Sequence, residues 1–205
     1  MMLNNFKTNI FVLIFAVVFT LKSYSYEIND HRIAVLVNEE IITTYDIVQR
    51  MKINSIIQGI DITPENNQLL ANSVVDELIH EIVKSEKVME YKIKVDKDEL
   101  IEFESNFLKR TKFTKEELTR IFELNDVKYA DLENLLTNQL SWQKLIGALY
   151  YRLTSASEIE INEVMERNQN ITYNQAEKIV IQKQLDLKSS KLFRDILNEA
   201  TIEYK

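Results

Sequence analysis

The sequence predicts a mostly α fold, a helical domain of six to seven helices with a small sheet formed by an N-terminal hairpin and the C-terminal strand. Only two glycines and one proline occur in 205 residues, against typical usage of roughly 7% and 5%. Apolar residues recur at helical spacing over most of the chain. Runs typical of β-strands stand near the two ends, at residues 33–43 and 200–204. Long periodic stretches with few turn residues favour helices joined by short loops.

Residues 1–25 are expected to form a secretory signal peptide, which leaves one helical domain over residues 26–205. Lys7 precedes 14 uncharged, mostly apolar residues, and small side chains follow at Ser23 and Ser25. This order is typical of a signal peptide with a cleavage site. A membrane-spanning helix needs about 20 apolar residues, and this run is shorter. Export to the periplasm is the prediction, and the alternatives are an uncleaved membrane anchor and a buried strand.

The composition excludes several classes of function. Removal of residues 1–25 takes away two lysines and no acid, so the formal net charge falls from −7 to −9. No basic stripe stands out, which argues against a nucleic-acid partner. The absence of cysteine excludes disulfides and cysteine-based zinc sites. Because no phosphate loop, nucleophile elbow or metal-ligand spacing occurs, we expect no catalytic residue, cofactor, metal or small-molecule substrate.

The first predicted element is a β-hairpin over residues 33–43. Two β-branched runs flank a polar turn at residues 38–40, and Asn38 is the residue expected to take a positive φ. Both runs are apolar at nearly every position, which predicts burial of both faces. An isolated two-stranded hairpin is barely stable in water. A third strand is therefore expected, and alternation at residues 200–204 predicts it there.

The helices follow from caps and apolar spacing. Thr43 and Asp46 form a capping-box pattern, and Gly59 is expected to end that first helix. A two-sided apolar stripe predicts one long helix from Glu65 to about Tyr91. Three further capping-box patterns, Asp96 with Glu99, Thr114 with Glu117 and Ser157 with Glu160, predict helices near residues 97–110, 115–125 and 158–168. Apolar stripes predict two more, at about residues 129–153 and 174–199.

This order of elements resembles the SurA-like periplasmic chaperones. The hairpin Ile-Ala-Val-Leu-Val-Asn…Ile-Ile-Thr runs directly into the helix capped with Asp46. The similarity is strongest over residues 114–133 and 139–145, and residues 192–204 are similar to the closing helix and strand of the family. The resemblance implies a chaperone that binds unfolded or extended polypeptides. It covers nearly all of residues 33–205, apart from about 165–175.

Two departures from the family are visible. Lys92 and Asp126 stand where the family often has glycine. SurA-like foldases also carry parvulin-type prolyl isomerase domains before the closing helix, whereas only residues 168–173 occupy that point here. A separate domain needs at least about 50 residues. The resemblance therefore implies the chaperone part of a foldase without its isomerase, and no enzyme activity.

The candidate client-binding residues are Met51, Ile57, Phe113, Tyr150 and Tyr151. Methionine and aromatic side chains adapt to varied partners. Helical spacing cannot show which apolar residues stay exposed, so packing in the core is the alternative for each. The binding cleft is expected where the closing helix crosses the first helices.

The function implied is periplasmic holding of unfolded exported proteins, with outer-membrane protein precursors as expected clients. A scaffold subunit that uses the same groove for one fixed partner is the rival hypothesis. A degenerate foldase that keeps isomerase activity is disfavoured by the missing segment. Contact with a membrane is expected only through an uncleaved signal segment.

Overall fold

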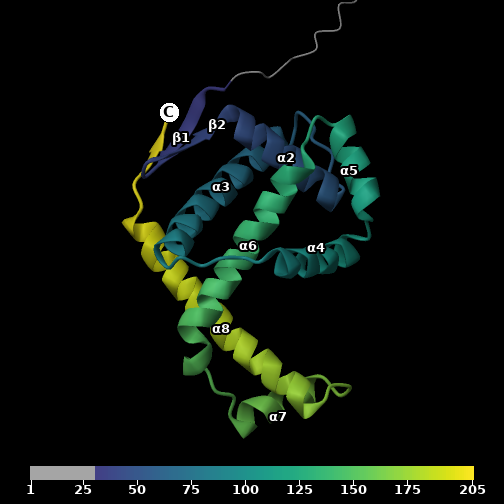
Figure 1. The fold of residues 1–205 in the computed structure, drawn as a ribbon, viewed down its shortest axis with the longest axis vertical. Coiled ribbons are helices and arrows are strands. Elements are labelled where there is room, and N and C mark those ends of the chain that lie inside the picture. The colour runs from purple at the N-terminus through teal and green to yellow at the C-terminus, as the bar shows by residue number, and fades with distance from the viewer. Residues whose placement is uncertain (1–30) are drawn as a thin grey trace, which may run out of the picture. The chain divides into compact units, whose positions relative to one another are not determined.

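The computed structural model describes residues 31–205 (Figure 1). The predicted signal peptide, residues 1–25, lies outside the described residues. The described elements are β1 (Ile33–Val37), β2 (Glu40–Thr43), α2 (Thr44–Gln58), α3 (Asn67–Glu90), α4 (Lys97–Thr111), α5 (Lys115–Leu124), α6 (Tyr129–Tyr150), the 3-10 turn η1 (Tyr151–Leu153), α7 (Glu158–Arg167), α8 (Tyr173–Glu199) and β3 (Ile202–Tyr204). Within residues 31–205, seven α-helices and one small sheet therefore confirm the predicted fold class.

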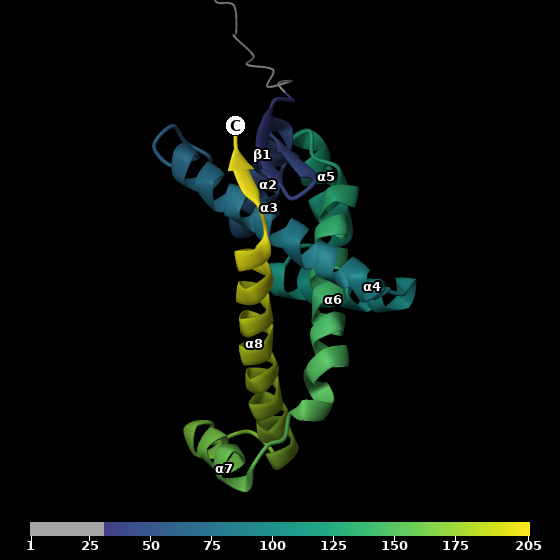
Figure 2. The same ribbon diagram turned by 90° about the vertical axis from the view of Figure 1, so that its left-hand side faces the viewer.

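The sheet joins the two ends of the described chain in the order β2-β1-β3 (Figures 1 and 2). Both pairings are antiparallel, with Val37 opposite Glu40 in one and opposite Ile202 in the other. Asn38 turns the hairpin with a φ of 52°. Its main-chain N–H donates to the Thr201 carbonyl at 2.8 Å, and its side-chain oxygen accepts the Thr201 N–H at 2.9 Å. The predicted pairing of hairpin and C-terminal strand is confirmed.

Burial of the hairpin is one-sided, so the predicted burial of both faces is wrong. Val35, Val37 and Ile42 are buried against α3, whereas Ile41 is 50% exposed and Ile33 is 47% exposed. Helices pack fully against one face of this small sheet. Among residues 31–205, no second layer of comparable size covers the other face, so the side chain of Ile41 stays half exposed.

Helix boundaries follow the local capping chemistry. Five helices begin with reciprocal capping boxes, of which four are the predicted ones. The fifth, unpredicted box opens α8 with Thr172 and Gln175. Gly59 ends α2 with a φ of 65°, as predicted. Lys92 and Asp126 themselves adopt φ values of 55° and 54°, so these positions keep the left-handed turn without the glycine that favours it.

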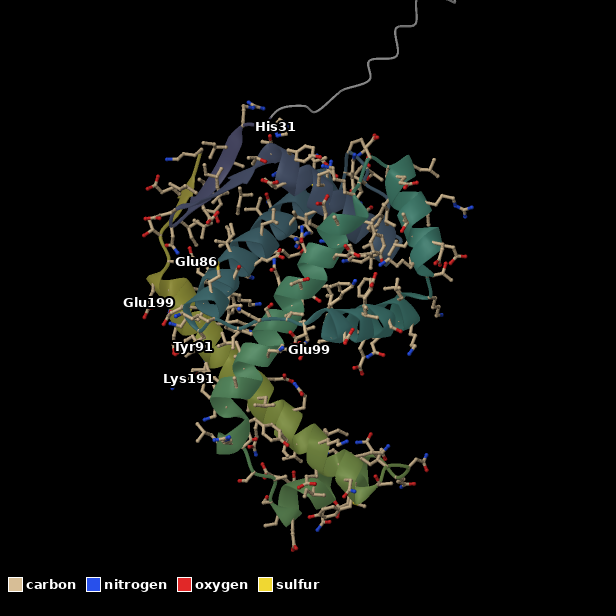
Figure 3. The ribbon with its side chains drawn as sticks, in the orientation of Figure 1. His31, Glu86, Tyr91, Glu99, Lys191 and Glu199 are labelled. Atoms are coloured by element: carbon tan, nitrogen blue, oxygen red, sulfur yellow. The ribbon has the colours of Figure 1, made fainter. Side chains whose placement is uncertain are left out.

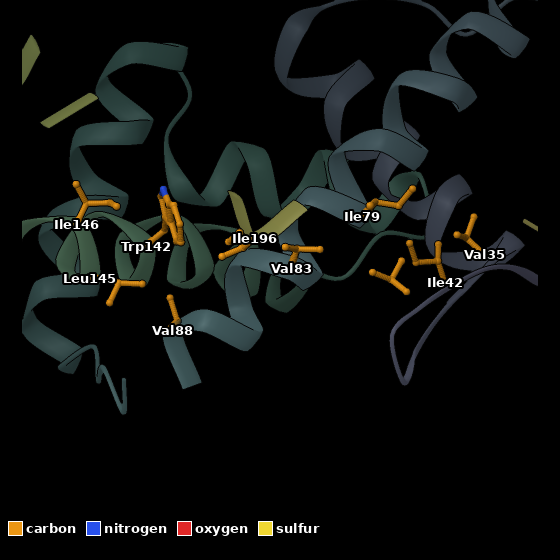
Figure 4. Close-up of a cluster of buried hydrophobic side chains, with 10 residues drawn as sticks. Val35, Ile42, Ile79, Val83, Val88, Trp142, Leu145, Ile146 and Ile196 are labelled. Carbon is orange, nitrogen blue, oxygen red and sulfur yellow. The ribbon is translucent and has the colours of Figure 1, made fainter. Parts of the chain in front are cut away.

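Three buried clusters hold the described chain together. The first cluster joins the sheet to α3, α6 and α8, and Figure 4 shows Val83, Trp142 and Ile196 among its members. The second joins α2, α4, α5 and α6 around Phe122 and Leu132. The third is small and lies between α7 and the beginning of α8, at the end of α8 far from the sheet (Figure 2).

One carboxylate is buried at the edge of the second cluster. Glu104 is 8% exposed, and its Oε1 accepts a hydrogen bond from the Tyr129 hydroxyl at 2.5 Å. Lys115 Nζ lies 2.9 Å from the same oxygen. Burial, followed by the bond to Glu104, raises the pKa of Tyr129 well above its ordinary value. These contacts supply the partners that a buried charge needs, and they fix α4, α5 and α6 to one another.

Candidate functional site

A hollow with a volume of about 470 Å³ lies between β2, α2, α3 and α6. We call it the first hollow. It is lined by Glu40, Ile41, Ile42, Tyr45, Asp46, Gln49, Arg50, Ile53, Leu78, Glu81, Ile82, Ser85, Glu86, Met89, Asp131, Asn134 and Asn138. Its size falls within the range of typical ligand sites, roughly 300–1,000 Å³.

Helical spacing brings these side chains to one place. The lining residues of α2 recur every three to four positions, from Tyr45 through Gln49 to Ile53, and therefore share one face. The same spacing holds on α3 from Leu78 to Met89. The capping box at the start of α2 sets the angle at which that helix leaves β2, so the strand forms one wall of the hollow.

A polar bridge forms the inner boundary of the first hollow. Arg50 Nη2 lies 2.6 Å from Glu81 Oε2, and Asn138 Nδ2 donates to Glu81 Oε1 at 2.8 Å. The side chains of Arg50 and Glu81 are only 11% and 17% exposed. Both carboxylate oxygens of Glu81 thus have donors, which is the condition for burying an ion pair. The bridge ties α2, α3 and α6 together at one point.

A second hollow of about 360 Å³ shares this bridge, since Arg50, Glu81 and Asn138 line it too. Lys84 lies on its wall with Nζ 5.8 Å from the centre of the Trp142 ring. Burial lowers the pKa of Lys84, and burial together with the charge of Lys84 lowers the pKa of His80. The two hollows flank one ion pair, but the second is lined mainly by α3 and α6.

The first hollow is acidic. Five carboxylates line it, and Arg50 is its one basic residue. Asp46 is used by the helix cap and Glu81 by the bridge. Glu86 lies on α3 close to the strands (Figure 3) and accepts a hydrogen bond from the neutral Asn38 amide at 2.7 Å. Its negative charge is therefore not neutralised by that partner.

The side-chain oxygen of Gln49 is buried and has no hydrogen-bond partner among the described residues. Gln49 is 9% exposed and lines the first hollow. An unpaired buried acceptor costs about 1–3 kcal/mol. Such groups are rare in native proteins.

Within residues 31–205, no group of histidine, aspartate and glutamate side chains is placed to hold a metal ion. In the same range, no helix combines the length and apolarity needed to cross a bilayer. The first hollow places the apolar side chains of Ile41, Ile82 and Met89 beside carboxylates and amides.

Comparison with known proteins decides the family. The family model described as the SurA-like N-terminal domain matches residues 2–146, more than half of the sequence. The chain belongs to this family. No curated protein matches the chain. The resemblance seen in the hairpin, the caps and residues 114–133 and 139–145 is thereby confirmed.

One similar solved chain comes from work on two proteins of the human pathogen Campylobacter jejuni. These proteins, the virulence factor PEB4 and the periplasmic protein Cj1289, are described there as structurally related SurA-like chaperones. The match has 24% sequence identity and a TM-score of 0.37. It covers 67% of the present chain and 50% of the solved one, so this SurA-like domain spans about half the length of that chain.

The predicted client-binding residues of the SurA-like domain do not share one surface. Met51 is buried, and Ile57 and Phe113 pack against the second cluster. Tyr150 packs against the first cluster, whereas Tyr151 is 60% exposed in η1. None of the five lines the first or second hollow. Their role in binding remains a prediction.

The hollows also lie in a different place from the expected cleft. No residue of α8 lines either hollow, so the crossing of the closing helix with the first helices does not form them. We call the two hollows together the groove. Its lining includes polar residues such as Gln49 and Asn138, and helical spacing does not distinguish such residues from polar residues on any other solvent-exposed helix face. The one sequence signal was the row Asp131, Asn134 and Asn138, which recurs along one face of α6.

Proposed function

We propose that this SurA-like domain holds unfolded exported polypeptides in the periplasm, without enzyme activity, and that outer-membrane protein precursors are its clients. The family supplies the general chaperone role. The observation that supports a client site is the pair of hollows along α3, with apolar patches beside polar groups. Unfolded chains expose apolar side chains and main-chain amides. The apolar residues of the hollows can contact the first, and their polar residues can hydrogen-bond to the second.

The affinity expected from this groove is weak. Its apolar residues are few, and Ile41 and Met89 keep half or more of their surface exposed in the free protein. Burial of apolar surface contributes about 25 cal/mol per Å², and ordering a flexible client opposes it. A chaperone benefits from this balance because it must release its clients.

A matched pair of double variants tests the proposal. Ile41→Thr with Met89→Gln removes exposed apolar side chains from the groove, and Ile179→Thr with Leu187→Gln removes side chains of similar exposure from α8. An unfolded β-barrel protein is diluted from denaturant, and its aggregation is followed by light scattering. The unmodified protein should suppress aggregation at near-stoichiometric amounts, and only the groove variant should lose this effect. Equal activity of both variants would move the client site away from the groove.

The absence of isomerase activity is tested separately. We propose that a proline-limited refolding reaction runs at its uncatalysed rate in the presence of this protein. The barrier to that isomerisation is about 18–20 kcal/mol, so catalysis requires a dedicated pocket. Accelerated refolding would contradict the proposal.

Export and partner number are tested in the cell envelope. We propose that residues 1–25 are removed and that the mature protein begins at Tyr26, with residues 26–205 as the chaperone domain. Mass spectrometry of envelope protein reads the first residue directly, and an intact Met1 on a membrane-bound species would identify an anchor. Crosslinking followed by identification of bound chains should recover many partners. One fixed partner would instead support the scaffold hypothesis.

A further inference from the structure

One of the two free edges of the sheet, the edge of β2, lies beside the acidic first hollow. In the order β2-β1-β3, β2 is paired on one side only, and Glu40, Ile41 and Ile42 of this strand line the hollow. An unpaired strand edge presents main-chain donors and acceptors to any extended chain that reaches it.

The register shows which main-chain groups of β2 are free. The carbonyl of Ala34 in β1 accepts from the Lys205 N–H, and the N–H of Asn38, directly after β1, donates to the Thr201 carbonyl. The main-chain groups of even-numbered residues in this segment therefore point toward β3. Leu36, which stands opposite Ile41, follows this alternation. The pair Leu36–Ile41 is therefore a non-hydrogen-bonded pair, and the N–H and C=O of Ile41 point away from β1.

Neighbouring positions on this edge are already used. The Thr43 N–H donates to Asp46 Oδ2 at 2.8 Å in the helix cap. The exposed edge of β2 is thus short, with Ile41 at its centre, and its apolar side chain is 50% exposed. A docked strand gains few main-chain hydrogen bonds there and needs additional contacts from the hollow.

Charge supplies those contacts and selects the occupant. Glu40, Glu86 and Asp131 line the hollow with carboxylates that form no ion pair among the described residues. They surround the strand edge with negative charge at neutral pH. A basic segment is favoured there, and an acidic one is repelled.

We propose that the first hollow binds an extended, basic polypeptide segment, which adds to the free edge of β2 as a fourth strand. The inference rests on the proposed holding function and specifies how a client segment is bound. Main-chain N–H and C=O groups of the segment pair with Ile41, and its lysine or arginine side chains reach the carboxylates of Glu40, Glu86 and Asp131. The buried, unpaired oxygen of Gln49 lies in the same lining.

Three labelled peptides test this mode with the full protein by fluorescence anisotropy. The first alternates valine and lysine, the second carries N-methyl groups on alternate main-chain nitrogens, and the third has glutamate in place of lysine. N-methylation removes main-chain donors and leaves the side chains unchanged. It should weaken binding roughly tenfold, as expected for the loss of one or two hydrogen bonds. The glutamate peptide should bind more weakly still at low salt.

Protein variants locate the site. Glu86→Gln with Asp131→Asn should weaken binding of the lysine peptide and reduce its dependence on salt. Glu203→Gln, on the opposite edge strand, is the control and should leave binding unchanged. Ile41→Pro, which removes the edge N–H, should act like N-methylation of the peptide. The N-methyl comparison uses the unmodified protein, so it decides the question even where a variant fails to fold.

The outcomes separate this inference from the proposed function. Equal binding of the lysine and N-methyl peptides would overturn strand addition, and equal binding of the glutamate peptide would overturn the preference for basic segments. In both cases, suppression of β-barrel aggregation would leave the holding function in place. Self-association of the free protein that Ile41→Pro abolishes would make a second copy the occupant and would overturn the proposal.

Discussion

The part of the domain that contains the first and second clusters, which we call the body, and the end of the domain at α7 are held together in different ways. We call residues 156–180, from the loop before α7 to the first part of α8, the tip. Three buried residues, Ile161, Ala176 and Val180, form the core of the tip, and they lie close together in sequence. In the body, the first cluster joins residues as distant as Val35 and Ile196. Local contacts therefore hold the tip, whereas contacts between distant segments hold the body.

This difference predicts unequal stability along one chain. The tip is joined to the rest through the continuous helix α8. A side-chain clamp holds the two segments that flank it together, since Gln184 donates to the Ser155 carbonyl at 2.9 Å and accepts the Ser155 N–H at 3.2 Å. A small cluster protects its amides less than a large one does. The tip should open locally while the body stays folded.

Matched core truncations should give the largest contrast. Ile79→Ala in the body and Ile161→Ala in the tip remove the same atoms from sites that are 3% and 1% exposed. Ile79→Ala should lower the free energy of unfolding by about 2–5 kcal/mol, as measured by denaturant titration. Ile161→Ala should mainly accelerate hydrogen exchange in α7 and early α8. Equal global destabilisation by both would show that tip and body unfold as one unit.

Deletion of residues 201–205 should give the next largest effect. It removes β3 and exposes the edge of β1, and the loss of Ile202 burial alone costs about 2 kcal/mol. The melting temperature should fall, with faster hydrogen exchange in β1 and unchanged exchange in the tip. An unchanged melting temperature would mean that β3 contributes nothing to the body.

A smaller, stabilising effect is expected at the turn after α3. Lys92 has a φ of 55°, which costs a residue with a side chain roughly 1–2 kcal/mol. Lys92→Gly should raise the free energy of unfolding by about 1 kcal/mol, because glycine adopts a positive φ without strain. Glycine also makes the unfolded chain more flexible, and this offsets part of the gain. Lys94→Gly, outside the left-handed turn, is the control and should not stabilise the protein.

The smallest effect concerns pH. The folded pKa of His80 lies below its ordinary value, mainly because of burial. The unfolded chain therefore protonates His80 more readily than the folded protein does. Protonation favours unfolding, so the protein keeps its full stability above the unfolded pKa of His80 and loses part of it as the pH falls from that value through the folded pKa. Comparison of His80→Gln with the unmodified protein between neutral pH and pH 5 should show a shallower loss in the variant. The same loss of stability with falling pH in both proteins would contradict a lowered pKa of His80.

The sequence predicted the elements of the domain better than its site. Caps such as Thr43 with Asp46 act within one turn of helix, so the residues themselves specify them. The strand at residues 200–204 was predictable because the hairpin needed a partner. One-sided burial of the hairpin was missed, since Ile41 and Ile42 look alike in sequence but face opposite sides of the sheet.

The groove could not be predicted for a related reason. It forms where faces of α2, α3 and α6 converge, and its residues are mostly polar ones that a single helix would present to water. Arg50 and Glu81 are 31 positions apart, and only the packing of α2 against α3 brings them together. Met51, by contrast, had the right chemistry for a client site but lies on the buried side of the same helix.

The pairing of β1 with β3 also has a consequence for how the chain folds. Val37 and Ile202 are partners, and nearly the whole domain must be synthesised between them. At roughly 5–20 residues per second, β1 exists for on the order of ten seconds before its second neighbour. Until β3 covers it, the five-residue edge of β1 is open in place of the three-residue edge of β3, and open edges invite pairing with other chains. Newly made molecules are therefore most prone to self-association just before the last strand arrives.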